Sequence, residues 1–177
     1  MSDMVLSKLY KHFFAIPETT VYAVLDGASV PGLPQMLMRM NIEWVCLTPG
    51  ELEPDIAQVA PYLAVLQRDA PFAEWALQEG WGRHWGIFAI SPVNLRTLRD
   101  HLRSFLTVYD PQLQPLNFRY YDPRVLRIYL PTCNSLELQT VFGPVVRYFL
   151  EGDEPTTLLK FWRESGRQLG NESVALA

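Results

Sequence analysis

The hydrophobic pattern from the N-terminus to about residue 100 alternates between short apolar runs and longer segments with helical spacing. The clearest run, residues 20–26, is rich in β-branched and aromatic residues and lacks an apolar–polar alternation. This pattern predicts a strand that is buried on both faces. Similar runs predict three more strands, at residues 43–47, 62–66 and 85–90.

The segments between these runs carry apolar residues three and four positions apart, as amphipathic helices do. Helices are therefore predicted over residues 5–14, 31–40, 52–59, 71–80 and 91–105. Prolines near several of the predicted starts, and Gly80 at the end of the fourth helix, are typical boundary residues. Regular alternation of strand and helix favours an α/β fold with a mostly parallel or mixed sheet and helices on both faces.

The pattern changes after residue 105. Residues 105–109 and 116–120 read as two strands joined across Asp110-Pro111, which predicts an antiparallel hairpin. Beyond it, the spacing predicts helices over 123–130, 136–142 and 156–165, with a strand over 145–150. A chain of 177 residues without a Ser/Gly linker is expected to form one domain. Within that domain we expect an α/β part, residues 1–145, with a small, mainly helical C-terminal lobe, residues 146–177, packed on it.

The charge balance argues against nucleic acid as a partner. The formal net charge is −4, and no run of basic residues is present to neutralise phosphates. Of the fifteen basic residues, only Lys8, Lys11 and Lys160 are lysines. Arginine makes two-pronged contacts that suit buried ion pairs and protein interfaces.

Several features predict a protein of the cytoplasm. Cys46 and Cys133 lie far apart without a Cys-x-x-Cys spacing, which fits a reducing compartment. The N-terminal residues lack the apolar core and cleavage site of a secretory signal. The longest near-continuous apolar run, residues 60–66, contains a proline and is too short to span a bilayer, so no membrane association is expected.

The most conspicuous glycine cluster is the sequence Gly-Trp-Gly-Arg-His-Trp-Gly at residues 80–86. A phosphate-binding loop follows a strand and opens a helix, whereas this cluster follows a predicted helix and precedes a strand. Its tryptophans also leave little room for a phosphate. Two interpretations of Trp81, Arg83 and Trp85 remain: a structural turn whose rings pack into the core, or a partner-contact surface.

No catalytic, cofactor-binding or metal-binding residue is predicted. The three histidines are scattered, and no nucleophile motif is present. Asp26 ends a strand, where α/β enzymes often place a catalytic group, but it equally suits the polar start of a turn. An enzyme would need a deep pocket that gathers Asp26, Glu51, Arg83 and His84.

Residues 118–126 form the densest polar–aromatic cluster. Asp122 and Pro123 suit the N-cap and first position of a helix. Arg119 and Arg124, on either side of Tyr121, could bracket Asp122 or another carboxylate with charge-assisted hydrogen bonds. This arrangement indicates an ion pair that holds the fold, an interface, or both.

Two helices are candidate docking surfaces. The helix over residues 93–105 carries Arg96, Arg99 and Arg103 beside its apolar stripe. The predicted last helix carries Phe161 and Trp162. Both helices could instead face their own core.

Several blocks in this order resemble one known family. The blocks are YAVLDGA (22–28), APYL (60–63), GWGRHWGIF (80–88), LRDHLR (98–103), FRYYDPRVL (118–126) and FGPV (142–145). Together they resemble the adaptor-chaperone domain of bacterial type VI secretion, which was first catalogued as a domain of unknown function. The motif positions in this chain are Trp81, Arg83, Trp85, Arg119, Asp122 and Arg124.

The resemblance implies a cytoplasmic adaptor that is neither secreted nor catalytic. Such a protein binds a particular toxic effector and helps load it onto the cognate spike protein of the secretion needle. Two alternatives stay open: a regulatory protein that neutralises a toxin by binding it and, with less support, an α/β enzyme.

Overall fold

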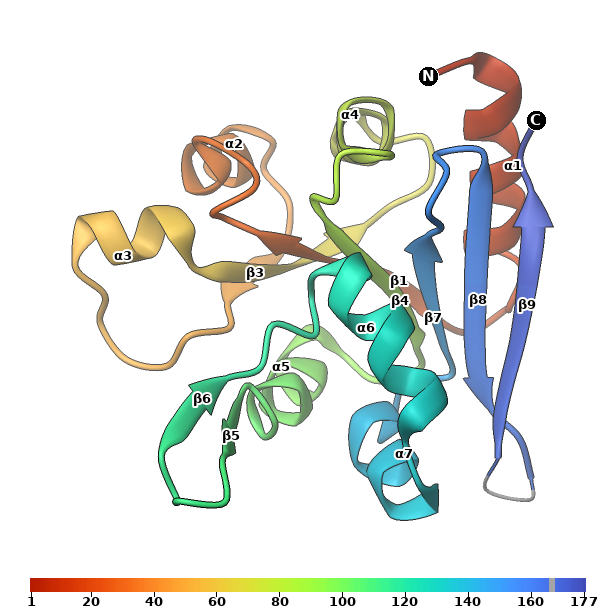
Figure 1. Cartoon of the computed structure of the whole chain (residues 1–177). Coiled ribbons are helices and arrows are strands. Elements are labelled where there is room, and N and C mark those ends of the chain that lie inside the picture. The colour runs from red at the N-terminus through yellow and green to blue at the C-terminus, as the bar shows by residue number, and fades with distance from the viewer. Residues whose placement is uncertain (166–167) are drawn as a thin grey trace.

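The computed structural model describes residues 1–165 and 168–177. A seven-stranded sheet forms its centre, with strand order β2-β3-β1-β4-β7-β8-β9, and a separate two-stranded sheet consists of β5 and β6 (Figure 1). The strands of the large sheet are β1 (Thr20–Asp26), β2 (Trp44–Cys46), β3 (Pro61–Leu66), β4 (Gly86–Ser91), β7 (Arg147–Glu151), β8 (Thr157–Arg163) and β9 (Leu169–Ala175). The small sheet is the hairpin of β5 (Thr107–Tyr109) and β6 (Pro115–Asn117), which confirms the predicted antiparallel hairpin.

The helices lie close to the segments in which helical spacing predicts them. They are α1 (Asp3–Phe13), α2 (Leu33–Arg39), α3 (Pro54–Val59), α4 (Pro71–Gly80), α5 (Leu95–Arg103), α6 (Pro123–Tyr129) and α7 (Ser135–Phe142), with a short 3₁₀ turn after α6. Proline occupies the first turn of α2, α3, α4 and α6, where its missing N–H costs nothing. The cap of α5 is Asn94, whose side chain accepts from the Thr97 N–H, so the helix begins later than the predicted residue 91.

The prediction of a mostly parallel or mixed sheet is wrong, because every pair of neighbouring strands is antiparallel. The crossovers through α2 and α4 do join strands of the same direction, β1 to β2 and β3 to β4. A strand of opposite direction, however, fills each gap: β3 lies between β1 and β2, and β1 lies between β3 and β4. This is the split β-α-β arrangement, and the alternation of strand and helix does not reveal the interposed strand.

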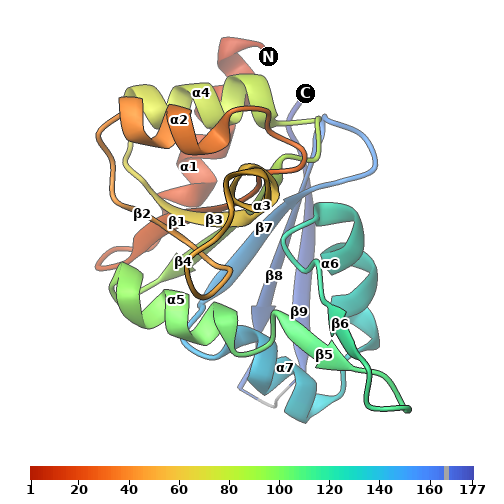
Figure 2. The same cartoon turned by 90° about the vertical axis from the view of Figure 1, so that its left-hand side faces the viewer.

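Both faces of the sheet are buried, as two-sided burial of residues 20–26 predicted. On β1, Val21, Ala23 and Leu25 belong to one core, and Tyr22 and Val24 belong to the other. Helices α1, α2 and α4 cover the first face, and α5, α6 and α7 cover the second (Figure 2). The fold is therefore α+β, with one antiparallel sheet between two layers of helices.

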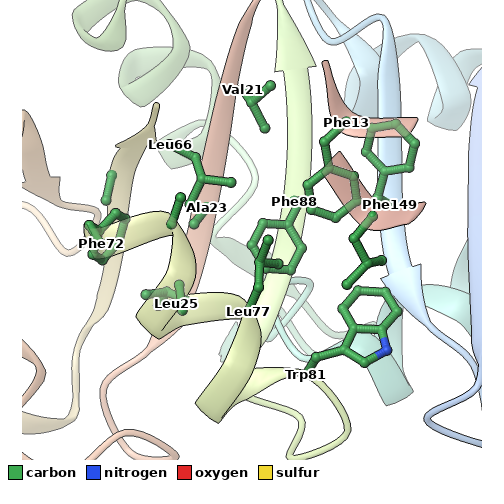
Figure 3. Close-up of a cluster of buried hydrophobic side chains, with 14 of the residues drawn as sticks. Phe13, Val21, Ala23, Leu25, Leu66, Phe72, Leu77, Trp81, Phe88 and Phe149 are labelled. Atoms are coloured by element: carbon green, nitrogen blue, oxygen red, sulfur yellow. The ribbon is translucent and has the colours of Figure 1, made fainter. Parts of the chain in front are cut away.

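Aromatic packing joins the first core across several elements (Figure 3). Phe13 of α1 contacts Phe88 of β4 and Phe149 of β7, with ring centroids 4.8 and 4.7 Å apart. Trp81, which follows α4, packs against Phe13 and Phe88 in the same cluster. Residues from the C-terminal part are thus integral to this core.

The prediction of a helical C-terminal lobe is also wrong. The segment predicted as a helix over 156–165 is strand β8, which pairs with β7 and β9 and extends the main sheet. Its apolar run, Leu158, Leu159, Phe161 and Trp162, suits a strand buried on both faces as well as a helix, so spacing alone cannot separate them. The predicted strand over 145–150 is confirmed as β7. In the part of the chain that the structure describes, no helix is both long and apolar enough to cross a membrane.

Candidate functional site

The carboxyl end of β1 meets the start of α6 in a group of charged side chains, here called the strand-end polar cluster: Asp26, Arg119, Asp122 and Arg124. The Asp26 side chain is only 2% exposed. Its carboxylate accepts from the Ala28 N–H (3.0 Å), the Ser29 hydroxyl (2.9 Å) and the Arg119 guanidinium (2.8 Å). Three donors satisfy the buried charge, so Asp26 closes the turn after β1 and fixes the loop before α6.

Asp122 is the second buried carboxylate of this cluster. It caps α6 by accepting from the Arg124 N–H at 3.0 Å, and the Arg124 guanidinium binds it through Nε (3.0 Å) and Nη2 (2.7 Å). Arg119 Nη2 lies 3.6 Å from the Asp122 carboxylate, so the predicted bracketing of Asp122 by two arginines is confirmed. Burial alone would raise the pKa of Asp122, but the hydrogen bonds from Arg124 and the arginine charges hold that pKa below its usual value.

A third buried carboxylate, Glu151, lies where β7 ends, at the same edge of the sheet. It accepts from the Gly82 N–H and from the His84 ring. Gly82 and His84 both have left-handed backbone, with φ of 84° and 58°. Trp81 Nε1 donates to the Pro155 carbonyl at 2.7 Å, so the tight turn after α4 is fastened to the end of β7 and the loop that follows.

The two tryptophans of this turn pack inward, as the structural interpretation of the glycine cluster requires. Trp81 is 9% exposed, and the ring of Trp85 lies 5.0 Å from that of Trp75. Arg83 points to solvent and pairs with Glu79 at 3.5 Å. It lines a shallow hollow with Trp81 and Pro155.

The four residues named for an enzyme do not meet in that hollow, since Asp26, Glu51 and His84 take no part in it. Two of these residues have partners in other parts of the protein: Asp26 is paired with Arg119, and the His84 ring is hydrogen-bonded to Glu151. Across residues 1–165 and 168–177, no group of three or more His, Cys, Asp or Glu residues is placed to hold a metal ion.

The arginines of α5 have different surroundings. Arg103 donates through Nε to the Leu47 carbonyl (3.0 Å) and through Nη2 to the Cys46 carbonyl (2.8 Å), which ties α5 to the end of β2. Arg99 bonds to its neighbour Asp100 at 2.7 Å, and Arg96 is exposed. The guanidinium of Arg103 is therefore bound to backbone carbonyls of its own chain. This leaves Arg96 and Arg99 as the residues of the predicted arginine surface that are available to a partner.

Phe161 and Trp162 do not form the predicted helical docking surface, because they lie on strand β8. Phe161 is 5% exposed and belongs to the second core. Trp162 is half-buried, with the guanidinium carbon of Arg147 at 5.3 Å from its ring centre. These aromatic residues stabilise the C-terminal strands.

A feature that the sequence analysis missed lies between α3 and the β5–β6 hairpin, which are on the same side of the molecule in Figure 1. Six large apolar side chains on α3 and the hairpin are between 38% and 78% exposed, and we call them the hairpin–α3 surface: Ile56, Val59, Val108, Tyr109, Leu113 and Leu116. Val108 lines a separate hollow toward α7. An open hollow of about 370 Å³ lies between the two elements. Its lining includes Ile56, Val59, Leu116 and Tyr121, so one residue singled out from the sequence belongs to this site.

The available sequence signal for this surface was weak. Residues 106–118 contain a single charged side chain, Asp110, although a surface hairpin usually carries several. The sequence pattern predicts the hairpin but not that its strands remain uncovered by the rest of the fold. That depends on tertiary structure, since all residues of β5 and β6 are exposed.

This arrangement describes an antiparallel α+β protein in which the buried carboxylates of Asp26, Asp122 and Glu151 are hydrogen-bonded within the fold, while α3 and the hairpin expose apolar side chains. The chain belongs to the family described as a domain of unknown function (DUF4123), whose model matches residues 21–140. Searches of the curated proteins and of the solved structures gave no match.

Proposed function

We propose that this protein is a cytoplasmic adaptor that binds a type VI secretion effector and helps load it onto the cognate spike protein. The observation that carries the proposal is the family match over residues 21–140. That segment contains all but the last of the sequence blocks that resemble the type VI adaptor-chaperone family. In this proposal the protein acts by binding and catalyses no reaction.

The geometry supports a binding role. The three most conspicuous carboxylates, Asp26, Asp122 and Glu151, are buried and hydrogen-bonded within the protein, so their charges stabilise the fold. The hairpin–α3 surface instead displays apolar side chains next to an open hollow. Exposed apolar patches of this kind mark interaction sites on folded proteins.

Co-expression with the neighbouring effector and spike genes tests the proposal. Affinity pull-down followed by size-exclusion chromatography should recover a complex with the effector, which either includes the spike protein or passes the effector to it. An effector from an unrelated gene cluster serves as the matched control and should not be retained. If the folded protein binds neither neighbour, the adaptor proposal fails. Binding of the effector that blocks its toxicity without engaging the spike would indicate a toxin-neutralising protein instead.

A further inference from the structure

The hairpin–α3 surface contributes little to the protein's own core. Helix α3 has no buried residue, and the strands of the hairpin are exposed along their full length. Ile56 and Val59 are about half exposed, at 51% and 50%, as is Leu116 at 50%. Burial within the fold therefore does not account for these apolar side chains.

The backbone on both sides of the hollow is nevertheless held in place. The Tyr62 hydroxyl donates to the Ala57 carbonyl at 2.8 Å, and the Gly27 N–H donates to the Ala60 carbonyl at 3.0 Å, which fixes the end of α3. In the hairpin loop, one oxygen of Asp110 accepts from the backbone N–H of Gln112 (2.9 Å) and of Gln114 (2.8 Å). A site that is already formed binds with a smaller loss of conformational entropy.

The two chain segments that flank the hollow carry only acidic charged side chains, while the arginines beside it, Arg103 and Arg119, are hydrogen-bonded to the Cys46 and Leu47 carbonyls and to Asp26. Residues 40–67, which include α3, carry Glu43, Glu51, Glu53 and Asp55 and no Lys or Arg. Residues 106–118, which include the hairpin, carry Asp110 and no basic side chain. Glu51, Glu53 and Asp55 are exposed in and just before α3. An apolar centre with an acidic rim is complementary to a segment whose apolar residues are flanked by Lys or Arg.

We propose that the hairpin–α3 surface is where the effector docks, through a segment with apolar residues at its centre and Lys or Arg on its flanks. This inference rests on the proposed adaptor function. The apolar side chains of the segment occupy the hollow between Ile56, Val59 and Leu116, and its basic side chains approach the acidic residues before and within α3. The acidic rim also disfavours acidic segments, which contributes to selectivity.

The apolar part of the proposal is tested with Leu116→Glu and Ile56→Glu, measured by titration calorimetry against the purified effector. Each variant should weaken binding by about ten-fold or more, because it adds a charge at the centre of the contact. The matched control is Ile128→Glu on α6, which replaces an exposed isoleucine (69%) that lines neither hollow beside the hairpin, and it should change the dissociation constant by less than about two-fold. Circular dichroism and thermal melting confirm that all three variants are folded.

The charge part is tested with the triple variant Glu51→Gln, Glu53→Gln and Asp55→Asn. It should weaken binding and flatten its dependence on salt concentration, because opposite charges at an exposed interface are screened by salt. A control triple variant neutralises exposed acids elsewhere: Glu18→Gln, Glu154→Gln and Glu164→Gln. It removes the same net charge and should bind as the wild type does.

The occupant is identified with an array of overlapping peptides that cover the effector. The wild-type protein should retain peptides with an apolar centre and Lys or Arg flanks, and Leu116→Glu should lose them. Retention of acidic or wholly polar peptides would overturn the inference. It is also overturned if the wild type binds the effector and the Leu116→Glu and Ile56→Glu variants bind it equally well, an outcome that leaves the adaptor proposal intact. If the wild type does not bind the effector at all, the proposed function itself fails.

Discussion

The strand-end polar cluster and the hairpin–α3 surface use side chains in opposite ways. The cluster buries two carboxylates, and each has arginine and backbone partners at hydrogen-bond distance. The hairpin–α3 surface places apolar groups in water beside an open hollow. The comparison shows that charged residues that stand out in a sequence motif can stabilise the fold. Exposed Ile, Val and Leu residues, which no motif marks, are the side chains available to a partner.

The largest effect on stability is expected from Asp26→Ala. The substitution removes three accepted hydrogen bonds and leaves the Arg119 guanidinium without its closest carboxylate. We expect the free energy of unfolding to fall by about 3 kcal/mol, measured by urea denaturation. The exposed Asp55, changed to Ala, is the matched control and should cost less than about 0.5 kcal/mol. Equal losses in the two variants would contradict the assignment of Asp26 to the fold.

Asp122→Asn is expected to cost about 2 kcal/mol at pH 7, because it removes the charge that Arg124 binds while asparagine can still cap α6. The folded state lowers the pKa of Asp122 below the ordinary value of 3.8, so the charge stabilises the fold above that value. This contribution is lost as the pH falls through the lowered pKa. The difference in unfolding free energy between wild type and variant should therefore be constant from pH 7 to about 5 and shrink below pH 4. A difference that grows on acidification would contradict this linkage.

Arg103→Ala is expected to cost about 1 kcal/mol, since it leaves the Cys46 and Leu47 carbonyls without their side-chain donor. Arg96→Ala, on the exposed side of the same helix, should change stability by less than about 0.5 kcal/mol. Thermal melting of the two variants side by side separates a structural arginine from an exposed one. If Arg96→Ala is the more destabilising, the division of the α5 arginines described here is incorrect.

The smallest effect is expected on the hairpin–α3 surface itself. Ile56→Ser and Leu116→Ser replace side chains that are already half exposed, so each should change the free energy of unfolding by less than about 0.5 kcal/mol. Leu102→Ser in the second core, where the side chain is fully buried, is the contrasting control and should destabilise severely. A large loss in either surface variant would show that these residues hold the fold, and it would remove the distinction between the two regions.

Local structure was largely predictable from the sequence, and strand order was not. The two-sided burial of residues 20–26 and the capping of α6 by Asp122 follow from local residue types, and both are present. The interposition of β3 between β1 and β2 joins segments distant in sequence, and hydrophobic spacing contains no information about it. The segment 157–163 was misassigned because a short apolar run fits a buried strand and a helix equally well.

The candidate site was predicted only in part. The ion pairs of Asp122 with Arg119 and Arg124 could be proposed because the three residues are close in sequence. The pairing of Asp26 with Arg119 and of Glu151 with His84 joins distant segments, so no local pattern indicates it. Exposure of Ile56 and Leu116 is likewise a property of the folded chain, because similar apolar residues elsewhere in the sequence are buried.

The position of β4 in the sheet has a consequence for synthesis on the ribosome. β4 pairs with β1 on one side, but its other neighbour, β7, begins only at Arg147. Until that strand emerges, β4 presents an open edge, and Phe88 lacks its cross-strand partner Phe149. Nascent chains that stall before β7 would therefore expose an aggregation-prone edge. A fragment cut to residues 21–140, the range that the family model matches, lacks β7 and would present the same open edge.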